Sequence, residues 1–448
     1  MKRFRNLLLV AVFLVSNLVA CAQTDVETPN AKAGTSLEIL HVNDLHAQLM
    51  PLKDGTGGFA NVASYIKQEK TTRKDVFVMC AGDMVQGSAV STIYKGVPIF
   101  DILNYMDIDV ATFGNHEFDN GVEVAKKYLE TAKFPIISGT VFLVNKGLFA
   151  PAATKTFTVN GIRIGVIGAT TTESITDEAL KVSAPQRIVE KQLKELRGSC
   201  DVIVLLSHLG VEEDEKLASK VQGIDVIVGG HSHTVLKEPV RVGKTLVVQA
   251  GSKGQYVGRV ELALDPKTHR VTTSSGELVS IPVKGLEPDA EVAKRVKLWE
   301  DKVSSVVDVE IGHCEKSLSQ ERTSRFIETV LKSKFKTDFA LQEEGGTRTG
   351  IKAGTILIRD IYNVCPFDNT IVIFKLKKDE IEKVLKKGAT FTEEKPFYTL
   401  ATNSYTAKGL LRRLQVGGDQ IDRRDDDLRQ TIIDTVKEWK GVVPPKGK

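Results

Sequence analysis

The sequence has little excess charge, few cysteines and no apolar run that spans a membrane comfortably. Its 61 basic and 57 acidic residues nearly balance over 448 positions, which argues against non-specific binding to a nucleic-acid polymer. Its five cysteines show no CxxC or other metal-binding spacing, and no internal repeat is present. A composition that is 42% hydrophobic and 26% charged is typical of a folded protein, and the length favours two domains.

The N-terminus has the order of an export signal. Basic residues at positions 2, 3 and 5 precede an apolar stretch that ends near position 20, which suits a signal peptide. The stretch closes with LVAC at 18–21, which resembles the lipobox of bacterial lipoproteins; an ordinary signal peptide beside a cysteine is the alternative. We predict a signal peptide over 1–20, lipidation of Cys21, a flexible tether over 21–34, and an exported protein anchored to a bacterial membrane, facing the periplasm or the cell surface.

The remaining cysteines are Cys80, Cys200, Cys314 and Cys365. Their even number permits disulfides in an exported protein, but the sequence cannot pair them. Cys80 lies inside an apolar run and is expected to be a small core residue.

Strand-like and helix-like patterns divide the chain. Apolar runs alternate with helical patterns over 35–284, which predicts a first domain of α/β type. A helix is expected over 285–309, a second domain that mixes strands and helices over 310–440, and a tail over 441–448.

Five short apolar runs end in residues that bind divalent metals. They read LEILHVNDLH, VFVMCAGD, DVATFGNHE, DVIVLLSH and DVIVGGHSH. Such runs are typical of buried strands, and the loops at their ends converge on one crevice in α/β sheets. The Asp-x-His and His-x-His spacings are expected to place both side chains on one face of a strand end. Asp, Asn and His favour Zn, Mn, Fe(II), Co or Mg over Cu(I), so the pattern predicts a two-metal hydrolytic site.

The most specific group is GNHEFD at 114–119. Together with HVNDLHA, GDMVQGS, SHLG and GGHSH it resembles the calcineurin-like metallophosphoesterase superfamily, and within it the 5′-nucleotidase family. The resemblance is close in the first domain and loose in the second. It implies an α/β fold, in which a four-layer αββα metallophosphoesterase domain is joined by a helix to a smaller α+β C-terminal substrate domain.

The resemblance also implies roles for individual residues. One divalent ion (Zn, Mn, Co or Mg) would be bound by Asp44, His46, Asp83 and His233. The other would be bound by Asp83, Asn115, His208 and His231, with Asp83 bridging the pair. His116 and Asp119 would form the catalytic dyad beside a metal-activated water. Asn115 would also touch the substrate. His41 and His313 lie outside this pattern and are interpreted as structural, and Glu117 as a supporting residue rather than a ligand.

The second domain departs from the family pattern. QEEGGTR at 342–348 stands where the family reads QNGGGIR, and it keeps Arg348 as a candidate substrate-binding residue. Only residues 389–396 replace a long insertion, and GLLRR at 409–413 replaces a GGDGY or GGDGF segment. The two aromatic residues that stack on the nucleobase in that family are therefore expected to be missing. Phe397, Tyr398 and Tyr405 are the candidates to replace them.

The leading hypothesis is an exported dinuclear-metal phosphohydrolase, foremost a 5′-nucleotidase that releases phosphate from nucleoside monophosphates. An altered substrate domain keeps other phosphate esters open, namely UDP-sugars, 2′,3′-cyclic nucleotides or a non-nucleotide ester. An inactive surface-binding lipoprotein is the alternative from a different class. The expected partners are a small-molecule phosphate ester and, through the lipid, a membrane.

Overall fold

The computed structural model describes residues 35–173, 175, 177–385, 389–414 and 416–443. The signal peptide predicted over 1–20, Cys21, the tether over 21–34 and residues 444–448 of the predicted tail lie outside these ranges. The described residues fall within one compact unit, Ala33–Lys448. Within those ranges, no helix combines the length and apolar character that a bilayer span requires.

Two six-stranded sheets form the first half of the described chain. In spatial order, the first consists of β15 (Val271–Ser280), β14 (Tyr256–Leu264), β1 (Ser36–Val42), β2 (Val76–Cys80), β3 (Val110–Thr112) and β4 (Ile136–Ile137). The second consists of β12 (Val240–Val242), β13 (Thr245–Val248), β11 (Val226–Val228), β10 (Val202–His208), β8 (Ile162–Thr170) and β7 (Thr154–Val159). The strands β1 to β4 run parallel to one another, as do β8, β10, β11 and β13.

Alternating apolar residues explain why the sheets stack. In β2, Phe77 and Met79 join a core that lies between the two sheets, whereas Val78 and Cys80 join the core beneath the helices. This alternation follows from the two-residue period of a strand. Both faces of each sheet are therefore buried, which accounts for the near-continuous Val, Ile and Leu runs in the sequence.

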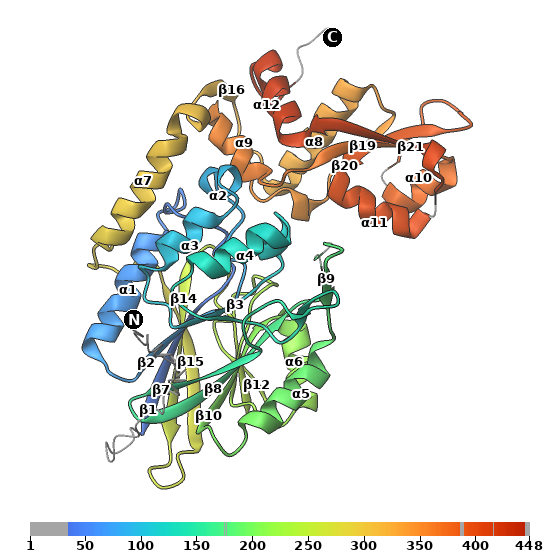
Figure 1. Cartoon of the computed structure of the whole chain (residues 1–448). Coiled ribbons are helices and arrows are strands. Elements are labelled where there is room, and N and C mark those ends of the chain that lie inside the picture. The colour runs from blue at the N-terminus through green and yellow to red at the C-terminus, as the bar shows by residue number, and fades with distance from the viewer. Residues whose placement is uncertain (1–34, 174, 176, 386–388, 415, 444–448) are drawn as a thin grey trace, which may run out of the picture. The chain divides into compact units, whose positions relative to one another are not determined.

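Helices cover the two outer faces and complete four layers (Figure 1). The first sheet is covered by α1 (Phe59–Thr72), α3 (Val97–Leu103), α4 (Val122–Thr131) and α7 (Ala290–Val307). The second sheet is covered by α5 (Pro185–Leu196) and α6 (Val211–Lys220). The predicted αββα architecture is confirmed. The short helix α2 (Ala89–Ile93) and a small sheet of β5 (Val141–Leu143), β6 (Gly147–Leu148) and β9 (Leu180–Val182) lie outside these layers.

The helix expected to connect the two halves is α7. It begins after Asp289, whose side chain accepts a hydrogen bond from the backbone N–H of Val292 and so caps the helix. Val292, Val296 and Val303 are buried in the core of the first sheet. The connecting helix is thus packed along its length rather than exposed on all sides.

The second half forms a smaller α+β arrangement. Its four-stranded sheet has the order β17 (Phe339–Leu341), β20 (Tyr398–Asn403), β19 (Thr370–Leu376) and β21 (Ile421–Asp427). One face packs on α8 (Gln320–Phe335), α9 (Ile358–Val364) and α12 (Leu428–Trp439), and the other on α10 (Lys378–Leu385) and α11 (Ser404–Leu414). The pair β16 (Glu310–Cys314) and β18 (Gly354–Leu357) lies beside α12.

The four cysteines within the described residues are all buried and all free. Cys80 lies in β2, as expected of a small core residue. The possibility of disulfides among these four is therefore not realised in the structure.

His41 is buried in β1 with 1% of its surface exposed. Its ring fills the space beside Gly258 on β14, where a β-carbon would lie 2.0 Å from His41 Nε2. Burial lowers the pKa of His41 to about 3. The unfolded chain therefore binds a proton at His41 near pH 6.5, whereas the folded protein does not bind one there until about pH 3. The contribution of His41 to stability is consequently complete above pH 6.5 and declines as the pH falls towards 3.

A His41→Phe variant is expected to remove this part of the pH dependence. Between pH 7 and pH 5 the wild type should lose about 2 kcal/mol more free energy of unfolding than the variant. Urea unfolding at the two pH values measures the difference. His313→Phe is the matched control, because His313 is exposed. If the free energy of unfolding of His41→Phe fell between pH 7 and pH 5 as much as that of the wild type, the low pKa of His41 would be refuted.

Candidate metal centre

Most of the predicted ligands lie in turns just beyond the strand ends, whereas His208 is the last residue of β10. β1 ends at Val42 and β11 at Val228, so Asp44, His46, His231 and His233 all follow the strands. The Asp-x-His and His-x-His spacings were expected to reflect the alternation of side chains along a strand, and this expectation is wrong. Five ligands instead adopt positive φ angles, which non-glycine residues rarely do: Asp44 (49°), His46 (44°), Asp83 (51°), His231 (76°) and His233 (54°). Such backbone strain clusters at functional sites.

One glycine permits the close approach of two of these turns. A β-carbon at Gly114 would lie 2.1 Å from Asp83 Oδ1, so any side chain there would displace the carboxylate. The backbone N–H of His116 donates to the same oxygen at 2.9 Å. The GNH turn after β3 therefore holds the Asp83 side chain in place.

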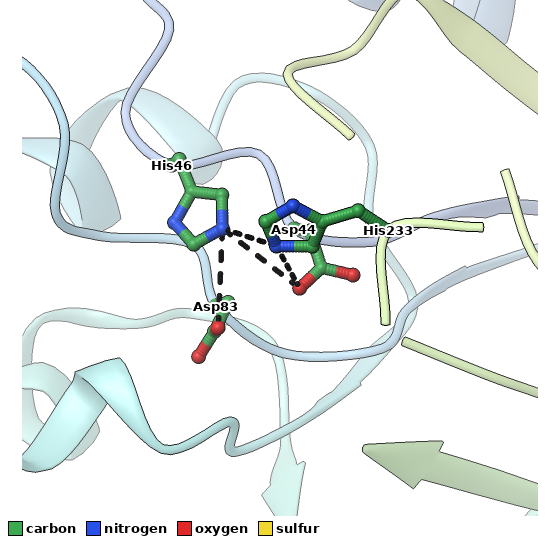
Figure 2. Close-up of side chains that lie close together, drawn as sticks. All are labelled: Asp44, His46, Asp83 and His233. Carbon is green, nitrogen blue, oxygen red and sulfur yellow. Dashed lines mark hydrogen bonds and ion pairs between the residues drawn. The ribbon is translucent and has the colours of Figure 1, made fainter. Parts of the chain in front are cut away.

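The first predicted ligand set comes together in the structure. The side-chain donor atoms of Asp44, His46, Asp83 and His233 all lie within 4.8 Å of one another. His46 Nε2 lies 2.9 Å from His233 Nε2, 3.9 Å from Asp44 Oδ1 and 4.0 Å from Asp83 Oδ2 (Figure 2). Burial and the charge of Arg348 lower the pKa of His46 well below its usual value. The ring is thus neutral, as a metal ligand must be.

The second predicted set meets at the same carboxylate. His208 Nε2 lies 3.2 Å from Asp83 Oδ2, and His231 Nδ1 lies 3.0 Å from Asn115 Oδ1. The rings of His208 and His231 are in edge contact, with their centres 5.3 Å apart. Asp83 Oδ2 thus lies within 4.0 Å of both His46 Nε2 and His208 Nε2, where the predicted bridging ligand would lie.

His208 provides a test of whether a cation fits. Its Nδ1 lies 2.6 Å from the carbonyl oxygen of Ala81 and must donate to it, because a carbonyl only accepts. Nε2 then faces a carboxylate oxygen 3.2 Å away, and this approach is favourable only with a proton or a metal ion between the two atoms. Although burial lowers it, the charge of Asp83 raises the pKa of His208 to about 10. A histidine oriented by a backbone carbonyl is how proteins present this side chain to metals, so the residues fit divalent ions.

His116 and Asp119 lie at the edge of this cluster. His116 Nδ1 is 2.6 Å from Asp119 Oδ2, and its Nε2 is 3.9 Å from Asp83 Oδ2. Burial lowers the pKa of His116, but the charges of Asp119 and Asp83 outweigh it and raise the pKa above its usual value. Nδ1–H therefore donates to Asp119 while Nε2 faces the cluster. The catalytic role of this pair stays a prediction.

Two neighbouring residues support the arrangement. Gln86 Nε2 donates to Asp119 Oδ2 at 3.1 Å, a contact to which the sequence reasoning assigned no role although Gln86 stands in the GDMVQGS motif. The Glu117 carboxylate accepts backbone hydrogen bonds from Asp83, Met84 and Gly114 at 2.6–3.1 Å. Glu117 therefore ties the two loops together and is not placed as a ligand, in agreement with its interpretation from sequence.

Arg348 reaches the cluster from the second half of the chain. It follows the short η2 (Glu344–Gly346), and its Nη2 lies 2.9 Å from His46 Nε2. Burial lowers the pKa of Arg348, and the charges of Asp83, Asp44 and Asp119 counteract this effect. Phe367, which sequence reasoning did not single out, lies 5.7 Å from the His116 ring, centre to centre, in a stacked orientation.

A cavity of about 500 Å³ opens beside His116 and Asn115. Its far wall comes from the second half of the chain and includes Arg348, Phe367 and Tyr405. Of the three aromatic candidates, Tyr405 is 46% exposed and lines the cavity, whereas Tyr398 is 2% exposed and belongs to the core. The Lys375 ammonium lies over the Phe397 ring, 5.0 Å from the ring centre. Phe397 does not line the cavity.

Comparison with known proteins places this geometry in context. Residues 37–235 match the calcineurin-like phosphoesterase model and residues 303–418 match the 5′-nucleotidase C-terminal domain model. The 5′-nucleotidase of Mus musculus is 29% identical over 80% of this chain and 72% of its own length. A trifunctional nucleotide phosphoesterase of Bacillus subtilis is 27% identical, but the chain spans only 28% of its length. The crystal structure of a 5′-nucleotidase precursor from Thermus thermophilus superimposes with a TM-score of 0.83 at 25% identity, covering 92% of this chain and 98% of that one.

Proposed function

We propose that this chain, which belongs to the calcineurin-like phosphoesterases and carries a 5′-nucleotidase C-terminal domain, is a two-metal 5′-nucleotidase. Its family makes it a phosphoester hydrolase. It would release phosphate from nucleoside 5′-monophosphates. The observation that carries this proposal is the position of Asp83, whose Oδ2 lies 3.2 Å from His208 Nε2 and 4.0 Å from His46 Nε2. One carboxylate would thereby serve both ligand sets.

The chain's own residues have separable tasks in this proposal. Two divalent ions held by the seven ligands would neutralise phosphate charge and make water more acidic. His116, oriented by Asp119, would place a proton at Nε2 near the departing oxygen. Asn115 and Arg348 would orient the phosphate, since a guanidinium suits bidentate contact with its oxygens.

The leaving group would occupy the 500 Å³ cavity, which falls within the range of small-molecule sites. Tyr405 is an exposed aromatic ring on its wall, where the half-buried Phe367 also lies, and stacking on one ring contributes about 1–3 kcal/mol per base. Stacking tolerates any base, because every base has an aromatic face, so the rings of Tyr405 and Phe367 by themselves favour weak discrimination between bases. UDP-sugars, 2′,3′-cyclic nucleotides and non-nucleotide esters therefore remain the competing substrates.

Export and lipid anchoring belong to the proposal and rest on the sequence of residues 1–21. The lipobox-like LVAC and the preceding apolar stretch support cleavage before Cys21 and attachment to a bacterial membrane. The mass of the mature N-terminal peptide distinguishes a diacylated cysteine from an ordinary signal-peptide product.

The test is phosphate release by the mature protein, stripped of metal and then resupplied with Zn, Mn, Co or Mg. AMP, UDP-glucose, 2′,3′-cAMP and p-nitrophenyl phosphate are compared. Metal-dependent turnover with AMP as the preferred substrate is expected. Turnover of p-nitrophenyl phosphate alone would refute the nucleotidase and keep the hydrolase, and metal binding without any turnover would favour the inactive lipoprotein.

One variant sharpens this comparison. Tyr405→Ala is expected to lower kcat/KM for AMP about tenfold or more, because the base loses its stacking partner. The value for p-nitrophenyl phosphate should stay within about twofold, since its small ring need not reach Tyr405. Equal losses for both substrates would mean that Tyr405 shapes the cavity rather than binding the base.

A further inference from the structure

Gln249 is a buried polar residue to which the proposed reaction assigns no task. It follows β13, which ends at Val248, and none of its surface is exposed. Its side-chain amide makes three hydrogen bonds, and all three reach the turn after β11 that carries His231 and His233. Burying an amide is unfavourable unless its polar atoms are hydrogen-bonded, so these contacts hold the side chain in place.

The three contacts of this amide alternate with the two histidines. The amide nitrogen donates to the carbonyl oxygen of Gly230 at 2.7 Å. The amide oxygen accepts from the Ser232 hydroxyl at 3.0 Å and from the backbone N–H of Thr234. His231 lies between the first and second contacts, and His233 between the second and third. Each predicted ligand is therefore held on both sides by one side chain.

The amide fits in one orientation only. A carbonyl oxygen only accepts hydrogen bonds and a backbone N–H only donates them. The amide nitrogen must therefore face Gly230, and the amide oxygen must face Thr234. A flipped amide would lose both contacts, so the side chain restrains the turn at two fixed points.

The turn adopts a conformation that requires such restraint. His231 has a φ of 76° and His233 a φ of 54°. Residues other than glycine rarely adopt this left-handed backbone, and it persists where the surrounding structure over-determines it. The contacts on both sides of each histidine provide that determination.

Backbone hydrogen bonds hold the two ends of the same turn. The N–H of Gly229 donates to the carbonyl oxygen of Val248 at 2.8 Å, and the N–H of Gly251 donates to that of Thr234 at 3.1 Å. The side chain of Gln249 lies between these ends and reaches the interior of the turn. The backbone thus anchors the turn, and the amide shapes the part that carries the ligands.

The segment 249–251 also contacts the loop that carries Asp44. Asn43 Oδ1 accepts the backbone N–H of Ala250 at 2.8 Å. Asn43 Nδ2 donates to the carbonyl oxygen of Gly251 and to Asp44 Oδ2, both at 2.7 Å. One predicted ligand of the loop after β1 and two of the turn after β11 therefore take their positions from the same three residues.

We propose that Gln249 is a positioning residue for the metal centre, whose amide fixes the turn on both sides of His231 and His233 and so aims the two imidazoles at their ions. Gln249 acts through these predicted ligands and is not a ligand itself. The loss of an outer contact that orients a metal-binding histidine weakens metal binding about 10–100-fold. The inference rests on the proposed function only for the binding of metal by the two histidines.

Titration of the metal-stripped mature protein with Co(II), followed by calorimetry and visible absorption, measures this role. Gln249→Met keeps an unbranched side chain of similar length and removes both polar atoms of the amide. The variant is expected to bind Co(II) about 10–100-fold more weakly than wild type. Its visible absorption bands should also change, because they depend on the geometry of the ligands. The Tm of the metal-free protein, measured in parallel, reports folding alone.

Two further variants separate positioning from stability. Thr245→Val is the matched control, because Thr245 is 3% exposed, begins the same strand and donates its hydroxyl to the carbonyl oxygen of Ile224 at 2.8 Å. It should lower the Tm of the metal-free protein and leave the Co(II) affinity unchanged. Gln249→Asn keeps the amide but is one methylene shorter, so it cannot reach all three contacts and should weaken Co(II) binding as well.

The outcomes distinguish the inference from the proposed function. Wild-type Co(II) affinity in the Gln249 variants, whatever their Tm, overturns the positioning role, and Gln249→Asn decides alone if Gln249→Met does not fold. An equal loss of affinity in Thr245→Val also overturns it, because stability would then explain the effect. Wild type that binds no Co(II) overturns the metal centre and the inference together. Weakened binding in the Gln249 variants of a protein that hydrolyses no ester refutes only the proposed function.

Discussion

Asp83→Asn is expected to abolish metal-dependent hydrolysis and to prevent the protein from holding two divalent ions. Asp83 is 2% exposed, and its Oδ2 faces both His46 and His208. Asparagine keeps the size but removes the charge that balances two cations. Loss of several kcal/mol of transition-state stabilisation corresponds to a decrease in kcat of about a thousandfold or more. Elemental analysis after dialysis and a phosphate-release assay measure the two effects.

Thermal stability gives an independent reading of the same variant. A ligand that binds only the folded state stabilises it, so added metal should raise the Tm of wild type and leave Asp83→Asn nearly unchanged. Asp107→Asn is a matched control, because Asp107 is exposed and also has a positive φ, 56°. If Asp83→Asn still bound two ions per chain and kept full activity, the assignment of Asp83 as the ligand that bridges the two ions would be refuted.

His116→Ala should lower kcat for AMP about 10²–10⁴-fold while the metal content stays at the wild-type value. The ring contacts Asp119 through Nδ1 and faces the cluster through Nε2, so its removal takes away a proton donor but no predicted ligand. The kcat for p-nitrophenyl phosphate should decrease less, because p-nitrophenolate departs without a proton.

The comparison of the two leaving groups separates the possible roles of His116. A similar loss for AMP and p-nitrophenyl phosphate would mean that His116 stabilises the phosphoryl oxygens instead of protonating the leaving group. His313→Ala serves as the control at an exposed position. Loss of metal together with activity would place His116 among the ligands, and retention of activity would remove it from the mechanism.

The fold was largely predictable because its strands are buried on both faces. Runs such as Val202–His208 contain almost no polar residues, which marks a strand inside a layered sheet. The four layers were confirmed, although their order came from family resemblance and not from periodicity. The spatial order of β12-β13-β11-β10-β8-β7 depends on long-range pairing, about which local sequence says little.

The candidate site was predictable in its residue types but not in its geometry. Asp44 and His46 were expected on one face of a strand, yet both lie in a left-handed turn beyond it. Periodicity describes regular elements only, and tertiary contacts such as that of Gly87 with the His46 carbonyl shape this turn. Phe367 belongs to none of the motifs and is recognised only by what it borders in space.

The sequence by itself determined the composition of the predicted metal site, because metal chemistry requires particular side chains and seven of them occur at strand ends in family order. It also determined the alternation of strands and helices, since burial on two faces requires apolar runs. Only the tertiary structure decided that Asp83 lies near both histidine groups and that Tyr405 rather than Tyr398 faces the cavity. These residues lie far apart along the chain, and their distances follow from the packing of whole layers rather than from any local preference.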